Sequence, residues 1–112
     1  MNAIIYAVDF DDTISTNGNY PMPGEPNIAL IEWLLERQKE GCKLVLWTCR
    51  EGVDQKIAVD FCNKYGLYFD AVNDNLVYIK QAFSVNSRKI FANYYIDDRC
   101  LVLPEVPLRG KP

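Results

Sequence analysis

The feature that most restricts the fold is an apolar run that ends at a cluster of carboxylates. Residues 3–8, AIIYAV, are hydrophobic without interruption, and Asp9, Asp11 and Asp12 follow them almost directly. A short continuous apolar run is typical of a central strand that is buried on both faces of a parallel sheet. Parallel strands need crossover connections, which are usually helices. The opening of the chain therefore predicts an α/β fold with its first strand inside the sheet.

The rest of the chain alternates helical and strand-like segments in the order that such a fold requires. Apolar residues recur at helical spacing within residues 26–41, where Pro26 suits the first helical turn, and again within residues 52–65. The segments KLVLWT (43–48), LYFDAV (67–72) and NYYIDD (93–98) have the composition of short strands. A strand, a helix and a second strand in succession favour a right-handed parallel crossover.

These segments predict one α/β domain with a three-layer, Rossmann-like open sheet that is mainly parallel and has helices on both faces. The 112 residues allow one such domain, with residues 103–112 as a tail. Residues 15–26 are rich in Gly, Pro, Asn and Ser, which marks a loop that is too short for a cap domain. Residues 73–88 are ambiguous, with one helical turn expected around residues 78–83.

The composition excludes several functional classes. The chain has no histidine, so a Ser/His/Asp or Cys/His nucleophilic system is excluded, and any hydrolysis must use carboxylates, lysine or a metal. A net charge of −3 with no basic run gives no patch for nucleic acid and none for an anionic membrane. The opening apolar run is too short to span a bilayer and lacks a leader pattern, so we expect a cytoplasmic protein.

The cysteines favour reduced thiols over a metal site. No two of them form a CxxC pair, and without histidine a zinc site would need all four thiolates to converge from scattered positions. We therefore expect buried, reduced thiols. The residues concerned are Cys42, Cys49, Cys62 and Cys100.

Polar residues follow three of the four expected strands. In open parallel sheets, ligands bind outside the carboxyl ends of the strands, where these residues would converge. Carboxylates within ~4–6 Å oppose one another's ionisation unless a cation lies among them. A ligand set made of oxygen atoms suits Mg²⁺ better than zinc or copper, and Mg²⁺ commonly also binds phosphate oxygens. The residues are Asp9, Asp11 and Asp12 after the first strand, Thr48 and Arg50 after the second, and Asp97, Asp98 and Arg99 after the last.

Three of these groups resemble motifs of the haloacid dehalogenase-like phosphohydrolase superfamily. The first motif of that family, DxDx(T/V) after an apolar strand, is present here as DFDDT, residues 9–13. The second, an apolar strand that ends in Thr or Ser, is present as LVLWT with Thr48. The fourth, a strand that ends in paired acids, is present as YYIDD with Asp97 and Asp98.

The third motif of that family is a lysine upstream of the last strand. Lys89 in NSRKIFANYYIDD resembles it, with Lys80 as the alternative. The four motifs then stand in the order of the family, and the resemblance extends from the N-terminus to about Arg99. It implies a small member of the superfamily without a cap domain.

The resemblance also implies roles for the individual residues. Asp9 would attack phosphorus to form an aspartyl-phosphate and would bind Mg²⁺. Asp11 would exchange protons with the leaving group and then with water, and its backbone carbonyl would be a second Mg²⁺ ligand. Asp97 and Asp98 would complete the metal shell, Asp98 directly or through water.

The phosphoryl oxygens would be bound by other residues. Thr48 and Lys89 would donate hydrogen bonds and positive charge to them. Arg50 would bind substrate phosphate or pair with a carboxylate, and both alternatives are open. Asp12 is expected to be structural and Arg99 to form an ion pair, while Thr48 taken alone is more typical of a helix cap.

The expected function is thus a Mg²⁺-dependent phosphatase that acts on a phosphorylated small molecule or a phosphorylated macromolecule, and homo-oligomerisation stays possible. One alternative is a receiver-type phospho-switch, which shares the aspartate cluster, the threonine, the lysine and Mg²⁺. Its phosphorylated aspartate would lie mid-chain, where Asp70 is the candidate, and its lysine would follow the last strand, whereas Lys89 precedes the final acids. A second alternative is an inactive module that keeps the fold.

Overall fold

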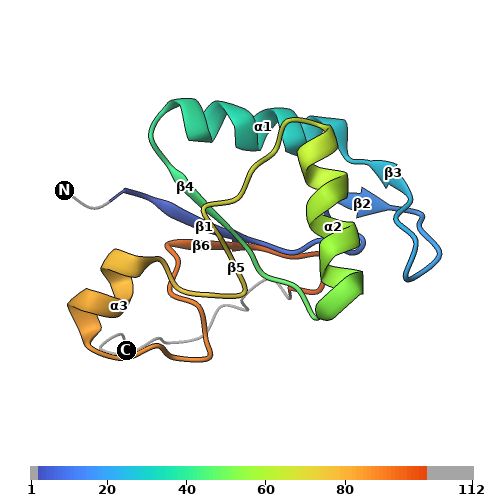
Figure 1. Ribbon diagram of the computed structural model, residues 1–112. Helices are drawn as coiled ribbons and strands as arrows, with labels where there is room; N and C mark the ends of the chain where they lie inside the picture. The colour runs from blue at the N-terminus through green and yellow to red at the C-terminus, as the bar shows by residue number, and fades with distance from the viewer. Residues whose placement is uncertain (1–2, 101–112) are drawn as a thin grey trace, which may run out of the picture.

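The computed structural model describes residues 3–100 and contains a four-stranded parallel sheet with helices on both sides (Figure 1). The expected tail, residues 103–112, lies outside the described residues. The elements are β1 (Ile5–Val8), β2 (Ser15–Thr16), β3 (Glu25–Pro26), α1 (Ile28–Lys39), β4 (Lys43–Leu46), α2 (Gly52–Lys64), β5 (Ala71–Val72), α3 (Val77–Phe83) and β6 (Tyr94–Ile96). No helix within residues 3–100 is both long enough and apolar enough to cross a membrane.

Strand β1 lies inside the sheet, as its uninterrupted apolar sequence predicts. The strand order is β5-β4-β1-β6, and every neighbouring pair is parallel. Val8, the last residue of β1, is opposite Leu46 of β4 and Ile96 of β6. The carboxyl ends of three strands therefore meet at one edge of the sheet.

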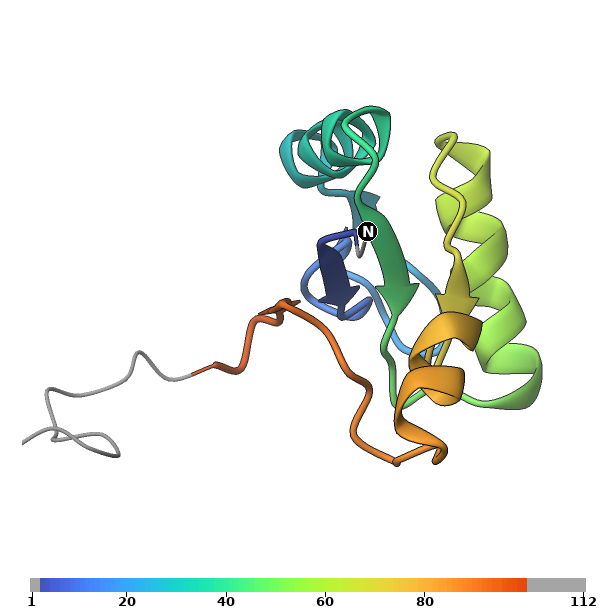
Figure 2. The ribbon, with the colours of Figure 1, turned by 90° about the vertical axis from the view of Figure 1, so that its left-hand side faces the viewer.

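The sheet has a separate apolar core on each face, because successive side chains of a strand point to opposite sides. On one face, Val8 packs with residues of α1 and α2 such as Leu34 and Cys62. On the other face, Ile5 packs with Ile79 of α3 and with Ile90. Figure 2 shows α1 and α3 on opposite sides of the sheet. The predicted three-layer α/β fold with helices on both faces is confirmed.

Helix α1 begins two residues later than expected. Pro26 lies in β3 opposite Ser15, and the helix starts at Ile28. Asn27 is the N-cap, since its side chain accepts a hydrogen bond from the Leu30 N–H at 3.2 Å. An asparagine side chain satisfies a free N–H at a helix start, which the proline ring cannot do. The expected first turn at Pro26 is therefore wrong.

Between β1 and α1 the chain forms a small β-hairpin, β2–β3, where a loop was expected. Ser15 and Thr16 pair with Pro26 and Glu25 in antiparallel register. The hairpin is tight because the backbone around Gly24 passes directly against the backbone of Thr16, where a Cβ atom would clash. No cap domain interrupts this connection within the described residues, in agreement with the prediction.

Replacing Gly24 with alanine is expected to destabilise the protein. The new methyl group would overlap the carbonyl oxygen of Thr16, so the hairpin would have to open. We expect the free energy of unfolding to fall by about 1–3 kcal/mol, the usual range for overpacking. Urea denaturation measures it, with Asn19→Ala at an exposed position of the same hairpin as the control. Equal stability of the two variants would contradict the tight packing at Gly24.

Candidate metal centre

Three carboxylates converge at the edge of the sheet where β1 and β6 end. Asp9 follows β1 directly, and Asp97 and Asp98 follow β6. The hydrogen bonding between β1 and β6 continues one residue past β1, because the Asp9 N–H donates to the Ile96 carbonyl at 2.9 Å. One carboxylate oxygen from each of the three aspartates lies within 4.8 Å of the others. Asp9 and Asp97 are partly buried and Asp98 is exposed, so the cluster opens to solvent.

The surroundings of Asp9 disfavour its charged form. Burial raises the pKa of Asp9 to about 6, and the nearby charge of Asp97 and the contact with Asp98 act in the same direction. A hydrogen bond from Thr13 opposes the rise in this pKa. A dication among the three carboxylates would remove the repulsion between them. Three convergent oxygen ligands are the donor set that Mg²⁺ and Ca²⁺ prefer, so the residues present fit a hard cation.

Thr13 ties Asp9 to the residues after β6. Its Oγ1 lies 2.9 Å from Asp9 Oδ2 and 3.4 Å from Asp98 Oδ1, and it accepts a hydrogen bond from the Asp98 N–H at 3.2 Å. The hydroxyl has one hydrogen, which the shorter distance assigns to Asp9. Thr13 is buried, so this hydrogen bond fixes the orientation of the Asp9 carboxylate. From the sequence, Thr13 is identified only as the last residue of the DFDDT motif. No role in orienting the Asp9 carboxylate is predicted for it.

The carboxylate of Asp11 lies in an ion pair with Arg50 rather than in the acidic cluster. Arg50 Nε donates to Asp11 Oδ2 at 2.9 Å, and Arg50 Nη2 donates to Asp11 Oδ1 at 2.8 Å. Hydrogen bonding to Asp11 raises the pKa of Arg50 above its ordinary value. Of the two alternatives for Arg50, pairing with a carboxylate is the one that the structure shows. The expected metal contact of Asp11 through its backbone carbonyl stays a prediction.

Arg50 is a buried junction between three segments of the chain. Its side chain is only 1% exposed. Besides binding Asp11, Arg50 Nη1 donates to the carbonyl of Pro21 at 2.8 Å and to that of Asp54 at 3.1 Å. The guanidinium also lies 4.7 Å from the ring centre of Tyr20. Arg50 therefore fastens the segment that carries the hairpin to the start of α2.

Thr48 occupies the turn between β4 and α2. Its Oγ1 accepts a hydrogen bond from the Arg50 N–H at 3.1 Å, which is a local turn contact. The helix cap expected of a lone threonine is not formed, because the N-cap of α2 is Glu51. Asn73 holds the same turn from β5, since its Oδ1 accepts from the Thr48 N–H at 2.8 Å. The Thr48 hydroxyl keeps its own hydrogen for a further acceptor. A phosphate contact of Thr48 stays a prediction, and sequence reasoning missed Asn73.

The two candidate lysines have different environments, and neither forms an ion pair with the acidic cluster within the described residues. Lys80 Nζ binds Asp74 Oδ2 at 2.9 Å. Lys89 Nζ lies 5.4 Å from the ring centre of Tyr95 and forms no salt bridge within residues 3–100. Lys89 is thus the one of the two whose charge no described carboxylate neutralises. Its contact with substrate stays a prediction.

The other singled-out residues lie at the rim. Asp12 is exposed with a φ of 62°, a turn conformation that Asp tolerates better than most residues. The Arg99 N–H donates to Asp97 Oδ1 at 3.0 Å. The side chain of Arg99 forms no ion pair in the described part of the chain, so the expected ion pair is not found there.

The expectation of buried thiols is wrong for Cys49 and Cys100, which are exposed, and right for Cys62.

Comparison with known proteins gives one informative similarity. The chain is similar to a conserved protein from Bacteroides thetaiotaomicron of known structure, with 39% sequence identity and a TM-score of 0.77. The match covers 93% of this chain and 84% of that chain. No protein-family model matches the chain, and no curated protein matches it. The similarity supports the parallel α/β fold, and the name of the relative states no ligand or reaction.

Proposed function

Because this chain belongs to the same family as the conserved Bacteroides thetaiotaomicron protein, whose name states no activity, we propose its function from the site: a Mg²⁺-dependent phosphomonoester hydrolase. The observation that carries this proposal is the convergence of Asp9, Asp97 and Asp98 within 4.8 Å. Such a gathering of like charges is costly unless a cation offsets it. The resemblance to haloacid dehalogenase-like phosphohydrolases adds the reaction class.

In the proposed reaction, Asp9 is the nucleophile. One of its carboxylate oxygens forms a bond to phosphorus while the bond from phosphorus to the alcohol oxygen of the substrate breaks. Water then attacks the phosphorus of the aspartyl-phosphate, which releases inorganic phosphate and restores Asp9. Thr13 orients the Asp9 carboxylate through the hydrogen bond at 2.9 Å. Bound Mg²⁺ would supply positive charge to offset the phosphoryl oxygens and the three carboxylates.

Asp11 is the proposed proton carrier for the leaving alcohol and for water. Both of its oxygens accept hydrogen bonds from Arg50, so the proton transfer requires this ion pair to loosen or to shift during the cycle. Thr48 and Lys89 are the proposed donors to the phosphoryl oxygens. Hydrogen bonds and fixed charge at these oxygens do most of the catalytic work in phosphoryl transfer.

The position of Asp70 argues against the receiver-type alternative. The Asp70 N–H donates to the carbonyl of Leu44, and Asp70 Oδ2 accepts from the Leu44 N–H at 2.8 Å. Leu44 lies near the start of β4, and Asp70 precedes β5. The candidate mid-chain acceptor therefore lies toward the amino ends of the strands, away from Asp9. The enzyme is the alternative in which the proposed phosphate acceptor, Asp9, lies in the acidic cluster.

Hydrolysis of p-nitrophenyl phosphate tests the proposal. We expect turnover with Mg²⁺, loss of turnover in EDTA, and recovery when Mg²⁺ is restored in excess. Full activity in the chelator would remove the metal from the mechanism. A long-lived acyl phosphate without turnover would instead favour the receiver-type switch.

A further inference from the structure

Asn73 lies at the point where the chain leaves the sheet after β5. Its N–H donates to the Leu46 carbonyl at 2.7 Å, which continues the hydrogen bonding between β5 and β4 by one residue. The backbone then turns, because Asn73 has a φ of 49°, in the left-handed region that asparagine tolerates better than most residues. Thr48, which lies beyond Leu46, is therefore bound by the side chain of Asn73.

The side-chain amide of Asn73 takes the place of a peptide group opposite Thr48. Asn73 Oδ1 accepts from the Thr48 N–H at 2.8 Å, and Asn73 Nδ2 donates to the Thr48 carbonyl at 2.8 Å. The backbone of a neighbouring strand would offer the same kinds of acceptor and donor. Both backbone groups of Thr48 are thus bound, although Thr48 lies two residues past the end of β4.

Other hydrogen bonds place the turn of Thr48 beside the chain that follows β1. The Trp47 N–H donates to the carbonyl of Val8, the last residue of β1, at 2.8 Å. The Arg50 N–H donates to Thr48 Oγ1 at 3.1 Å, while the Arg50 side chain binds Asp11. The turn is therefore fixed on the side of β1 by backbone contacts and on the side of β5 by Asn73.

These bonds leave the hydroxyl hydrogen of Thr48 available. Thr48 Oγ1 already accepts from the Arg50 N–H, and no acceptor for its own hydrogen is found among the described residues. Thr48 is partly exposed, so a ligand can reach this hydroxyl. Because the backbone of Thr48 is held, the position of the donor is set before a ligand arrives. Donors that are fixed in advance stabilise the charge of a transition state most effectively.

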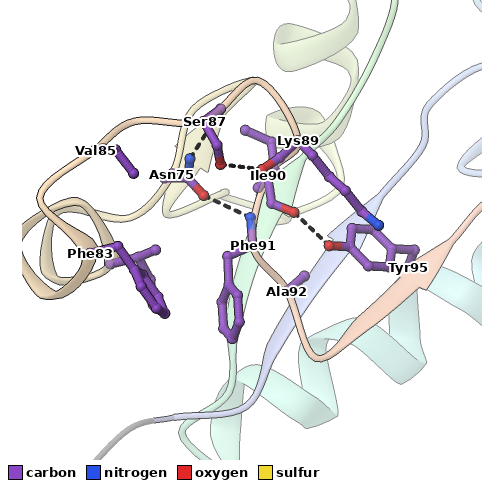
Figure 3. Close-up of a pocket in the computed structure, with 10 residues that line it drawn as sticks. Asn75, Phe83, Val85, Ser87, Lys89, Ile90, Phe91, Ala92 and Tyr95 are labelled. Atoms are coloured by element: carbon purple, nitrogen blue, oxygen red, sulfur yellow. Dashed lines mark hydrogen bonds between the residues drawn. The ribbon is translucent and has the colours of Figure 1, made fainter. Parts of the chain in front are cut away.

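Asn75, in the same connection between β5 and α3, uses its amide in a similar way on another segment (Figure 3). Asn75 Nδ2 donates to the Ser87 carbonyl at 3.1 Å, and Asn75 Oδ1 accepts from the Phe91 N–H at 2.7 Å. The residue is 3% exposed, and both partners lie between α3 and β6. Asn75 thus holds the segment that contains Lys89, whereas Asn73 holds the turn of Thr48.

We propose that Asn73 is a positioning residue for the contact between Thr48 and the phosphoryl group. This inference rests on the proposed function, since it takes the Thr48 hydroxyl to donate to a phosphoryl oxygen. Asn73 acts through the backbone of Thr48 and does not touch the substrate. Without the two hydrogen bonds the turn is free to move, and a displacement of about 1 Å in a site of this kind costs about 10²-fold in rate.

A double-mutant cycle tests whether Asn73 acts through Thr48. Asn73→Gly removes the side chain, and glycine adopts a positive φ without strain. We expect Asn73→Gly and Thr48→Val each to lower kcat/KM for p-nitrophenyl phosphate by about 10²-fold. In the Thr48→Val background, Asn73→Gly should lower it by no more than about two-fold further, because the hydroxyl that it positions is already absent. Equal losses in both backgrounds would overturn the inference.

Gln38→Ala is the matched control for a general loosening of β5. The Gln38 side-chain amide donates to the Tyr68 carbonyl at 2.8 Å, in the segment that leads into β5. Because Tyr68 lies before the strand and Asn73 after it, kcat/KM of Gln38→Ala should stay within about two-fold of that of the unmodified protein. A loss as large as that of Asn73→Gly would contradict a specific role for Asn73.

Hydrogen exchange at the Thr48 N–H reports on the contact without any catalysis. This N–H should exchange at least about ten-fold faster in Asn73→Gly and stay protected in Asn73→Asp, whose carboxylate still accepts from it. Equal exchange rates in the unmodified protein and in Asn73→Gly would overturn the inference. If the glycine variant does not fold, Asn73→Asp takes its place in the cycle, with an expected loss of about ten-fold that is again absent beside Thr48→Val.

Failure of the proposed function gives a different result. If the unmodified protein does not hydrolyse p-nitrophenyl phosphate, the phosphatase is overturned, and the same cycle is measured as binding of inorganic phosphate with Mg²⁺ by isothermal titration calorimetry. About ten-fold weaker binding in each single variant, with no further loss in the double variant, would keep Asn73 as a positioning residue of a phosphate site. Additive losses, or none, would overturn this inference as well.

Discussion

Replacing Asp9 with asparagine is expected to reduce phosphatase turnover by at least about 10³-fold, because an amide cannot form the bond to phosphorus. The substitution is nearly isosteric, and Thr13 Oγ1 still has an acceptor in the amide oxygen. The measurement is kcat with p-nitrophenyl phosphate and Mg²⁺, compared with Asp60→Asn. Asp60 is an exposed aspartate of α2 that pairs with Lys56, so its variant should keep its activity.

Thermal unfolding shows whether the loss of activity comes from the chemistry or from the fold. Asparagine cannot ionise, so the variant lacks the burial cost and the repulsion by Asp97 that raise the pKa of Asp9 to about 6. For an acid whose pKa is raised by folding, the charged form destabilises the folded state, and this loss develops between the ordinary value of 3.8 and about 6 and is complete above it. Without metal at pH 8, Asp9→Asn should therefore be at least as stable as the unmodified protein. A stable variant with unchanged kcat would place the nucleophile elsewhere.

Replacing Arg50 with alanine is expected to lower the free energy of unfolding by about 3 kcal/mol. Removing one member of a buried ion pair leaves the other without its partner and typically costs about 3–5 kcal/mol. The lower end applies here, because Asp11 is 39% exposed and water can reach it. The carbonyls of Pro21 and Asp54 lose their donor as well. Urea denaturation at neutral pH measures the change.

Two further variants identify the cause of that loss. Arg50→Lys keeps the charge but not the planar fork, so we expect it to recover only part of the stability. Lys56→Ala, which breaks an exposed ion pair of α2 with Asp60, should cost no more than about 0.5 kcal/mol. If Arg50→Ala lowers the free energy of unfolding as little as Lys56→Ala does, the contacts of Arg50 do not hold the hairpin to α2.

The strands and the acidic edge were predictable because their signals are local. Uninterrupted apolar runs before Asp9 and before Asp97 indicate buried strands, and parallel pairing brings the ends of such strands to one edge. Helical periodicity likewise marks α1 and α2 from their own residues. The gathering of Asp9, Asp97 and Asp98 follows from these rules alone, while the chemical role of each stays a prediction.

The side-chain partners were not predictable, because they depend on the path of the connection between β1 and α1. Whether Arg50 binds a phosphate or a carboxylate is decided by where that connection places Asp11, 39 residues away in the sequence. The strands β2 and β3 have two residues each, too few to show any periodicity, so Pro26 was assigned to the wrong element. The contact of Thr13 with Asp98 spans 85 residues and has no local signal at all.

The acidic centre depends on the pairing of β1 with β6. Asn93, just before β6, binds the Ile5 N–H across 88 residues of sequence, and β6 has β1 as its one neighbour in the described sheet. Asp9 and Asp97 therefore lie together only while β6 is paired with β1. A cation held by both thus binds the docked chain alone, and at about 100 times its dissociation constant such a ligand adds about 2.7 kcal/mol to the folded state. Divalent ions would then stabilise the pairing of the edge strand β6 with β1 and reduce its local unfolding.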